Sequence, residues 1–362
     1  MADLAQGDIQ AIVDRVVQRL GATGAPAVAS KASAPRSSGR GMFADVDSAV
    51  AAARQAFEIY STVPLETRKR MIANVRRRCT EAVELLSRLA VEETGLGRVP
   101  DKISKNLLVI NKTPGPEILE PKVFTGDYGL CLTEYAPYGT FGVITPCTNP
   151  TETVINNGIG MLSAGNTAVF NFHPSAKKVS ALCVSIINDA IVEAGGPENT
   201  LTAVIEPTIA SAQGLMKHPN VRLLCVTGGP AVVKVAMNSG KKVIAAGPGN
   251  PPCVVDETAD IEEAGKGIVA GASFDNNIVC IVEKEVFVVE SVADRLLAAM
   301  QKAGAVLQVV FPLDEVEVIA PRVSLIGKDV SKKLDDDIVA AIRSRPEVSS
   351  AVPRMNLAFP AA

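Results

Sequence analysis

Residues 141–172, which read FGVITPCTNPTETVINNGIGMLSAGNTAVFNF, decide the fold of this chain. The apolar run at 141–145 predicts a strand, and the residues at 151–163 predict a helix. The turn Ala164-Gly165-Asn166 leads into a second apolar run at 167–172, which predicts another strand. A strand, a helix and a strand in this order make a right-handed crossover between parallel strands, so the segment predicts an α/β fold.

The same alternation continues on both sides of this segment. Further helices are expected over 175–193, over 209–217 and up to about 238, and further strands over 202–206, 221–226 and 242–246. Before the segment, 46–59 and 65–93 predict helices, and residues around 123–137 predict a β-hairpin outside the main sheet. The whole pattern predicts a parallel sheet with helical crossovers.

Two glycine-rich turns follow predicted strands, namely Thr227-Gly228-Gly229 and Gly247-Pro248-Gly249. Parallel sheets bind ligands at the carboxyl ends of their strands, where helix N-termini offer N–H groups to phosphates and glycines allow close approach. The usual Gly-X-Gly-X-X-Gly fingerprint is absent. The turns therefore favour a dinucleotide site, with ordinary tight turns as the alternative.

Composition narrows the class of protein. The chain has 362 residues and a formal net charge of −3, which predicts two domains or one large α/β unit and gives no reason to expect nucleic acid. Its seven cysteines form no Cys-X-X-Cys pair and both histidines precede proline, so we expect no metal site.

No apolar run approaches the roughly 18 residues that cross a membrane. Free thiols without a secretory signal favour a reducing, cytosolic compartment.

An amphipathic helix is predicted at residues 8–20, ahead of a linker at 21–41. Its apolar residues recur at helical spacing, and they are Ile9, Ile12, Val13, Val16, Val17 and Leu20. The linker is rich in Gly, Ala, Ser and Pro without an apolar pattern, which predicts flexibility. Because so short a helix is marginally stable alone, its apolar face needs a partner. From the pattern alone, residues 1–20 are equally compatible with a docking peptide and with a helix that packs on the body of the chain or on an oligomer mate.

Five motifs follow one another along the chain. They are Thr145–Pro150, Ser163–Thr167, His173–Lys178, Val226–Pro230, and Ser273–Cys280 with Glu283-Lys284-Glu285. By these motifs the chain, from about Phe43 to Ala305, resembles the aldehyde dehydrogenase superfamily, and more closely the CoA-acylating aldehyde dehydrogenases of bacterial microcompartments. The resemblance implies an aldehyde dehydrogenase-like α/β fold. By the same resemblance we expect a parallel Rossmann-type NAD-binding domain at 42–255, with an oligomerisation hairpin at about 123–137. A partial or divergent α/β catalytic domain is expected at 256–362.

The resemblance also assigns site residues. Cys280 is then the nucleophile that attacks an aldehyde, and the Asn149 amide and the Cys280 N–H stabilise the oxyanion. The residues expected to bind NAD are Thr145, Pro146, His173 (at the adenosine half), Pro174, Thr227, Gly228, Gly229 and Gly247. From the residues alone, Cys280 is also compatible with a small buried hydrophobe, Asn149 with a helix cap, and Cys147 with a structural role.

One residue selects the acyl acceptor. Hydrolytic members of the superfamily carry a general-base Glu just before a Gly-Gly-Lys turn, and Ala245 stands at that place here. Without a carboxylate to activate water, the resemblance implies coenzyme A as co-substrate and acyl-CoA as product. The substrate is then a short-chain aldehyde, propionaldehyde or acetaldehyde.

The resemblance extends to partners and location. Microcompartment enzymes often carry an amphipathic helix on a linker that directs them into a protein shell, so we expect residues 8–20 to bind a shell protein. We expect a homo-oligomer in the bacterial cytoplasm, inside a microcompartment, without nucleic-acid or membrane partners. Beyond about Ala305 we expect a truncated or divergent ending. The alternatives are a non-catalytic shell-associated or interaction protein on a dehydrogenase fold, and a hydrolytic NAD-dependent aldehyde dehydrogenase.

Overall fold

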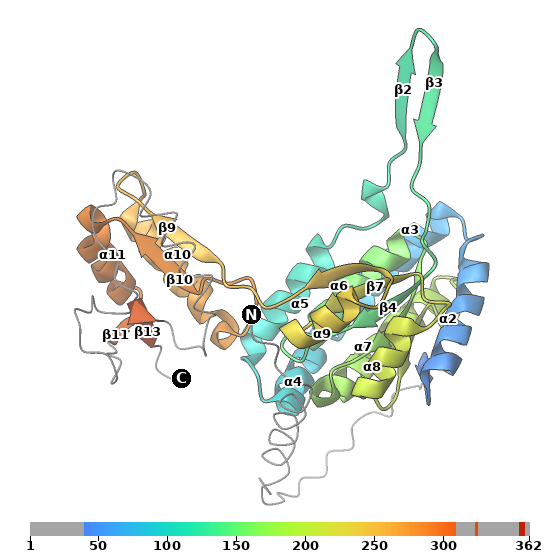
Figure 1. Cartoon of the computed structure of the whole chain (residues 1–362), viewed down its shortest axis with the longest axis horizontal. Helices are drawn as coiled ribbons and strands as arrows, with labels where there is room; N and C mark the ends of the chain where they lie inside the picture. Colours follow the sequence, from blue (N-terminus) through green and yellow to red (C-terminus); the bar gives the residue numbers. More distant parts are fainter. Residues whose placement is uncertain (1–39, 309–322, 325–354, 359–362) are drawn as a thin grey trace, which may run out of the picture. The chain divides into compact units, whose positions relative to one another are not determined.

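The computed structural model describes residues 40–308, 323–324 and 355–358 (Figure 1). The helices are α2 (Val46–Tyr60), α3 (Leu65–Glu81), α4 (Val83–Thr94), α5 (Val99–Lys112), α6 (Pro150–Ser163), α7 (Lys177–Glu193), α8 (Ile209–Lys217), α9 (Pro230–Met237), α10 (Ile261–Ser273) and α11 (Glu290–Lys302), with short 3-10 turns η1 (Pro116–Ile118), η2 (Pro174–Ala176) and η3 (Phe274–Asn277). The strands are β1 (Met42–Phe43), β2 (Lys122–Gly126), β3 (Gly129–Thr133), β4 (Thr140–Ile144), β5 (Thr167–Asn171), β6 (Leu201–Val204), β7 (Leu223–Thr227), β8 (Lys242–Ala246), β9 (Pro252–Val255), β10 (Glu285–Val288), β11 (Val306–Gln308), β12 (Val323–Ser324) and β13 (Met355–Ala358). The helix expected at 8–20 and the linker up to residue 39 lie outside the described residues.

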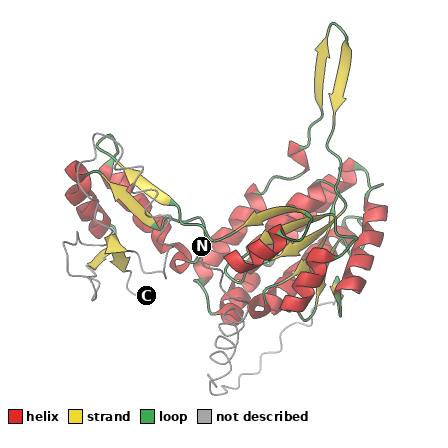
Figure 2. Cartoon of the chain, in the orientation of Figure 1, coloured by secondary structure: helices red, strands yellow, loops and turns green. Residues whose placement is uncertain are grey.

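Six strands form one parallel sheet in the order β1-β6-β5-β4-β7-β8. Figure 2 shows strands of this sheet in yellow among the red helices. The chain runs outward from β4 to β5 and β6 through α6 and α7, and then returns to β7 and β8 on the other side of β4. A reversal of this kind is the topological switch point at which doubly wound sheets bind ligands. The predicted parallel α/β fold is confirmed.

Helices cover both faces of this sheet. In β4, Val143 packs into a cluster with α3, α4, α6 and α7, whereas Ile144 packs into a cluster with α2, α8 and α9. In β5, Phe170 packs into the first of these clusters and Val169 packs into the second. Successive side chains of a strand point to opposite faces, so a strand buried on both faces needs apolar residues at successive positions. This requirement explains why residues 141–144, Phe-Gly-Val-Ile, contain no polar side chain.

Prolines set the starts of two helices that leave the sheet. Pro150 and Pro230 occupy the first turn of α6 and α9, where the missing N–H costs little. Asp45 starts α2 by a side chain that accepts a hydrogen bond from Ser48 N at 2.8 Å. Because α6 and α9 begin soon after β4 and β7 end, their N-termini lie near the carboxyl edge of the sheet.

A smaller parallel unit follows the large sheet. β9 pairs with β10, and α10 and α11 pack together with these strands around one apolar cluster. The cluster members are Val255, Ile261, Ile268, Val269, Val292, Leu296, Ala299, Met300 and Ala305. The loop between α10 and β10 carries Cys280, so this unit supplies the thiol.

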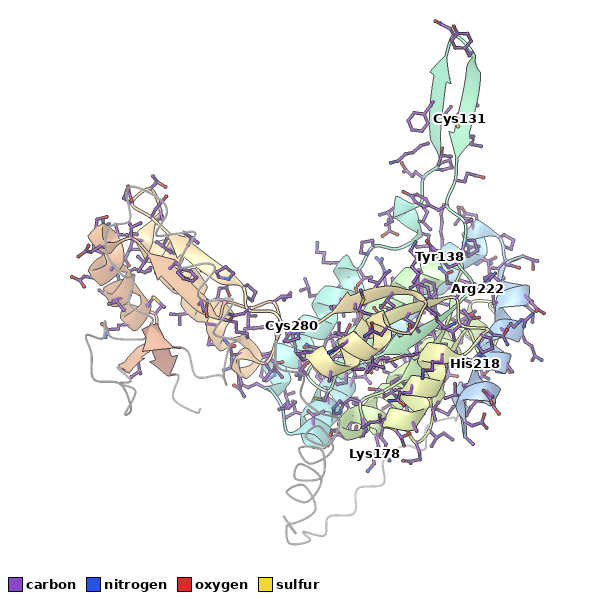
Figure 3. The ribbon with its side chains drawn as sticks, in the orientation of Figure 1. Cys131, Tyr138, Lys178, His218, Arg222 and Cys280 are labelled. Carbon is purple, nitrogen blue, oxygen red and sulfur yellow. The ribbon has the colours of Figure 1, made fainter. Side chains whose placement is uncertain are left out.

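The hairpin expected near 123–137 is formed by β2 and β3, which pair antiparallel across Asp127-Tyr128. Every residue of both strands is exposed, including the apolar side chains of Phe124 and Leu130. Figure 3 labels Cys131 on the same hairpin. Exposed apolar side chains grouped in this way are typical of a surface that binds another chain, and the oligomerisation role stays a prediction.

Two helical expectations need correction. The helix expected over 65–93 is divided at Ala82, whose φ of −96° and ψ of 0° interrupt the helix between α3 and α4. The helix α5 was not expected, because its inward face carries Lys102, Lys105 and Asn106 in place of apolar residues. Polar residues facing inward conceal the apolar period by which a helix is recognised in sequence.

Replacing Phe170 by alanine tests the two-sided packing of the sheet. Phe170 is fully buried in β5, and its ring stacks on Phe172 with the centroids 6.0 Å apart. Loss of the ring leaves a cavity, and we expect the free energy of unfolding to fall by about 3–5 kcal/mol, read from the urea midpoint. Val123→Ala on the exposed hairpin is the control and should change it by less than about 0.5 kcal/mol. Equal midpoints for Phe170→Ala and the wild type would contradict this packing.

Candidate active site

The parallel sheet brings the expected cofactor residues to one edge. All its strands run in the same direction, so their carboxyl ends, including those of β4, β5, β7 and β8, share that edge. The expected residues follow these strand ends: Thr145 and Pro146 after β4, His173 and Pro174 after β5, Thr227, Gly228 and Gly229 at the end of β7, and Gly247 after β8.

This edge offers an unpaired hydroxyl and open backbone. Thr145 is buried, and its Oγ1 has no hydrogen-bond partner among the described residues. A Cβ built on Gly229 or Gly247 would meet no atom within 4 Å, so open space borders both glycines. α9 begins directly after Gly229, and the first turn of a helix leaves N–H groups without intrahelical partners. These groups fit the diphosphate of a dinucleotide.

His173 presents a neutral ring at this edge. Its Nδ1 accepts a hydrogen bond from Ser175 N at 3.2 Å, and burial lowers the pKa of His173 below its usual value. A neutral imidazole whose Nδ1 accepts carries its proton on Nε2. His173 therefore offers a donor to a ligand, and its adenosine role stays a prediction.

The expected nucleophile lies on the loop between α10 and β10 (Figure 3). The loop passes through three consecutive left-handed residues, Asp275, Asn276 and Asn277, with φ of 50°, 54° and 60°. Asn and Asp tolerate this region better than other side chains. Asn277 Nδ2 donates to Ala272 O at 2.6 Å and so closes the loop on the end of α10. The turn leaves Cys280 partly exposed.

Cys280 differs from the buried cysteines in its surroundings. Burial raises the pKa of the Cys79 thiol to about 12 and that of Cys183 well above its usual value. Beside Cys280, Lys284 Nζ donates to Val279 O at 3.0 Å. Burial lowers the pKa of Lys284, and the negative charge of a Cys280 thiolate acts to raise it. Cys280 is therefore partly exposed and lies beside the Lys284 amine, whereas Cys79 and Cys183 are fully buried.

A buried group of charges, which we call the lysine–carboxylate cluster, joins this loop to α5 and α6. Its members are Lys102, Lys105, Glu152 and Asp275, all of them buried. Lys105 Nζ donates to Asp275 Oδ2 and lies 3.3 Å from Glu152 Oε1, and Lys102 Nζ lies 3.1 Å from Asp275 Oδ2. Two ammonium groups thus balance two carboxylates, which offsets the cost of burying charge.

Asp275 remains ionised in this cluster. Burial alone would raise its pKa, but hydrogen bonds from Lys105 Nζ and from Arg98 N, the latter at 2.9 Å, hold the pKa of Asp275 below its usual value. Its own backbone N–H donates to Asp101 Oδ2 at 2.9 Å. Asp275 is therefore bound on several sides by residues at the start of α5.

Asn149 stands at the N-cap position of α6 without capping the helix through its side chain. Its Oδ1 accepts from Lys105 Nζ at 2.5 Å, and its Nδ2 donates to Thr148 Oγ1 at 3.3 Å. An amide NH₂ has two hydrogens, so Nδ2 keeps one for a ligand. The helix-cap alternative is wrong for this side chain, and its role as an oxyanion donor stays a prediction.

Sequence reasoning missed Lys102, Lys105 and Asp275. A signal existed in the spacing of the two lysines, since residues three apart share one face of a helix. Charged residues on an inward face require buried partners of opposite sign. Glu152 and Asp275, one after Asn149 and the other before Cys280, were the available carboxylates.

The turn after β8 lies against the thiol loop. A Cβ built on Gly249 would come within 2.1 Å of the Cys280 carbonyl oxygen. Only a glycine fits this approach without moving one of the two backbones. Gly249 therefore allows the turn that follows Gly247 to lie directly beside the backbone of Cys280.

Within residues 40–308, 323–324 and 355–358, no helix is long and apolar enough to cross a membrane. The same residues hold no group of three or more His, Cys, Asp or Glu side chains arranged to bind a metal ion.

Residues 36–341 match the aldehyde dehydrogenase family, and the chain belongs to that family. The match continues to residue 341, so the expectation that the family pattern ends near Ala305 is wrong. The doubly wound sheet and the thiol loop described above lie within the matched residues.

Individual proteins that are similar to this chain describe the relationship more specifically than the family match does. The propanal dehydrogenase (CoA-propanoylating) of Salmonella typhimurium is 44% identical over 315 residues, which are 86% of this chain and 68% of the relative. The acetylating acetaldehyde dehydrogenase EutE of Escherichia coli is 48% identical over 302 residues, with coverages of 83% and 63%.

The solved structures that are similar to this chain include the same kind of enzyme. A propionaldehyde dehydrogenase from the Clostridium phytofermentans fucose utilisation bacterial microcompartment has a TM-score of 0.71 at 47% identity, over 73% of this chain and 60% of that one. A Rhodopseudomonas palustris propionaldehyde dehydrogenase, solved with bound CoA and an acylated cysteine, has a TM-score of 0.71 at 48% identity, over 73% and 61%. The chain spans between 60% and 68% of the length of these four relatives.

Gly249→Ala tests the approach of the turn to the thiol loop. The added methyl group would overlap the Cys280 carbonyl, so the loop has to shift, and we expect the rate of Cys280 alkylation by iodoacetamide to change by about tenfold or more. Gly267→Ala is the matched control, because a Cβ there would meet no atom within 4 Å. Mass spectrometry of the Cys280 peptide measures both rates. Equal rates in the two variants would rule out this contact.

Proposed function

We propose that this chain is a CoA-acylating aldehyde dehydrogenase that oxidises propionaldehyde or acetaldehyde with NAD⁺ and forms acyl-CoA through a thioester on Cys280. The observation that carries the proposal is the bridge from Asn149 through Lys105 to Asp275, which ties an oxyanion donor to the thiol loop. The names of the relatives, propanal and acetaldehyde dehydrogenases, support the same substrates.

The cofactor edge supplies the binding groups for NAD. We assign the diphosphate to the N-terminus of α9 and to the glycines before it, and the adenosine half to His173. The full set of assigned residues is Thr145, Pro146, His173, Pro174, Thr227, Gly228, Gly229 and Gly247. When bound, NAD⁺ supplies an acceptor for the hydride that leaves the substrate carbon.

The residues of the chain act on the aldehyde through Cys280 and Asn149. The Cys280 thiolate attacks the carbonyl carbon, a sulfur–carbon bond forms, and the carbonyl oxygen becomes an oxyanion. Asn149 Nδ2 and the Cys280 N–H donate to that oxygen, which lowers the energy of the charged state. Loss of hydride from the carbon then leaves a thioester. The CoA thiolate attacks this thioester, the same donors hold the second oxyanion, and the Cys280 thiolate leaves.

Transfer to CoA in preference to water follows from the absence of a general base at the expected position. Ala245, at the end of β8, carries no carboxylate. Burial alone would raise the pKa of Asp275, but its bonds to Lys105 and to Arg98 N hold that pKa below its usual value, so the Asp275 carboxylate is a weak base. A thiol acceptor needs no such base, because a thiolate is itself a strong nucleophile.

CoA dependence tests this function. We expect NADH formation from propionaldehyde and NAD⁺ to require CoA, because water is not activated, and we expect Cys280→Ala to reduce it by at least about 10⁴-fold, since the nucleophile is lost. Absorbance at 340 nm measures the rate. Cys131→Ala, on the exposed hairpin, is the control and should retain activity.

Other outcomes identify the alternatives. Equal rates with and without CoA would identify a hydrolytic aldehyde dehydrogenase. Folded protein without any aldehyde-dependent signal would identify a non-catalytic interaction protein.

We also propose that the chain works as a homo-oligomer inside a microcompartment of the bacterial cytoplasm. The Clostridium phytofermentans relative comes from such a compartment, which supports the location. The exposed apolar hairpin at 123–137 supports subunit contact. The apolar stripe of residues 8–20 is suited to binding a shell protein, because a helix on a surface binds through one apolar face.

Deletion of residues 1–20 tests the shell interaction. The shortened chain should lose co-sedimentation with purified shells, because the apolar stripe is gone, and should keep its turnover. A variant with Val13→Glu and Val16→Glu keeps the length and should behave like the deletion. Co-sedimentation of either variant at the level of the full chain would refute the interaction.

A further inference from the structure

Lys105 makes a connection that the proposed chemistry does not itself use. Its Nζ donates both to Asn149 Oδ1, at 2.5 Å, and to Asp275 Oδ2. Asn149 precedes α6, and Asp275 lies five residues before Cys280 on the thiol loop. One ammonium group on α5 thus binds the segment of the oxyanion donor and the segment of the nucleophile.

The chemistry of lysine fixes the direction of the Asn149 amide. An ammonium group only donates hydrogen bonds, so the amide atom that faces Lys105 has to be the oxygen. Nδ2 then lies on the other side, with one hydrogen on Thr148 Oγ1 and one remaining. A flipped amide would place N–H groups against a buried cation, which carries a large cost.

The position of Lys105 is itself fixed. Its side chain is 8% exposed, and its Nζ donates to Asn149 Oδ1 and Asp275 Oδ2 and forms an ion pair with Glu152 Oε1 at 3.3 Å. Two of the three ammonium donors are therefore used in hydrogen bonds, and the Glu152 carboxylate attracts the same charge from a third direction. A group bound on three sides holds its partners in one arrangement.

We propose that Lys105 is a positioning residue, which directs the Asn149 Nδ2–H toward the carbonyl oxygen of the substrate and holds the thiol loop beside it. The inference rests on the proposed function, in which Asn149 and Cys280 act on one carbonyl group. Lys105 acts through Asn149 and does not touch the substrate. Donors fixed in advance are the ones that stabilise an oxyanion most strongly.

Two reactions of Cys280 separate positioning from folding. With p-nitrophenyl acetate, the thiolate forms a bond to the ester carbon, an oxyanion develops, and p-nitrophenolate leaves with the electron pair of its C–O bond. With iodoacetamide, the thiolate displaces iodide and no oxyanion forms. The ratio of the acylation rate to the alkylation rate therefore reports the oxyanion donors, and neither reaction needs NAD or CoA.

Two charge-matched double variants compare the lysines of the cluster. Lys105→Met/Glu152→Gln removes the partner of the Asn149 side chain, and Lys102→Met/Glu152→Gln removes a buried lysine that binds Asp275 and the Thr148 carbonyl oxygen but not the Asn149 side chain. Each keeps the number of positive and negative groups equal. We expect the ratio to fall about 10–100-fold in the Lys105 variant, somewhat less than the loss of a whole oxyanion donor. In the Lys102 variant both rates should change together.

Adding Asn149→Ala to the Lys105 variant should lower the ratio of acylation to alkylation no further than Asn149→Ala alone, because both changes act on one donor.

A ratio unchanged in the Lys105 variant, or an equal fall in the Lys102 variant, overturns the proposal. If the Lys105 double variant does not fold, Lys105→Arg keeps the charge, displaces the donor, and should lower the ratio in the same direction. A wild type without CoA-dependent NADH formation refutes the proposed function separately, since the ratio is measured without either compound.

Discussion

The buried ion pair between Lys105 and Asp275 joins residues that are 170 positions apart in the chain. The large sheet builds the cofactor edge from its own strand ends, but the thiol comes from the smaller unit that follows. Asp275 is the residue at which the two meet, bound by Lys102, Lys105 and the backbone of Arg98. A buried ion pair contributes little net stability compared with apolar residues of similar size. Its effect here is geometric, since it determines where the loop with Cys280 lies.

The same pairing bears on the proposed choice of acyl acceptor. Glu152 and Asp275 are carboxylates close to Asn149 and Cys280 in the chain, and both form ion pairs with lysines. The pKa of Asp275 lies below its usual value, so this carboxylate does not take a proton readily. At the position where the resemblance places a general-base Glu in hydrolytic enzymes, this chain has Ala245. In the proposed function, the position of the thiol loop and the preference for CoA over water both involve this cluster of charges.

Much of the fold could be predicted from the sequence, because apolar period and turn residues act locally. The residues at 141–145 predicted a strand, and Gly228 and Gly229 marked the end of another strand. The parts that could not be predicted depend on long-range partners. α5 was missed because Lys102 and Lys105 have the polarity of a surface, and only Asp275 and Glu152 explain their burial. The direction of the Asn149 side chain likewise depends on Lys105, a residue 44 positions away.

The pairing of β1 with β6 has a consequence for synthesis of the chain. Met42 lies opposite Ala203 in the sheet, so the first strand emerges from the ribosome long before its partner exists. At a rate of about 5–20 residues per second, the roughly 160 intervening residues require about 8–32 seconds. During that time β4 and β5, joined by α6 alone, can already pair. The central strands are thus able to form a nucleus first, whereas the amino-terminal edge of the sheet has to wait for β6.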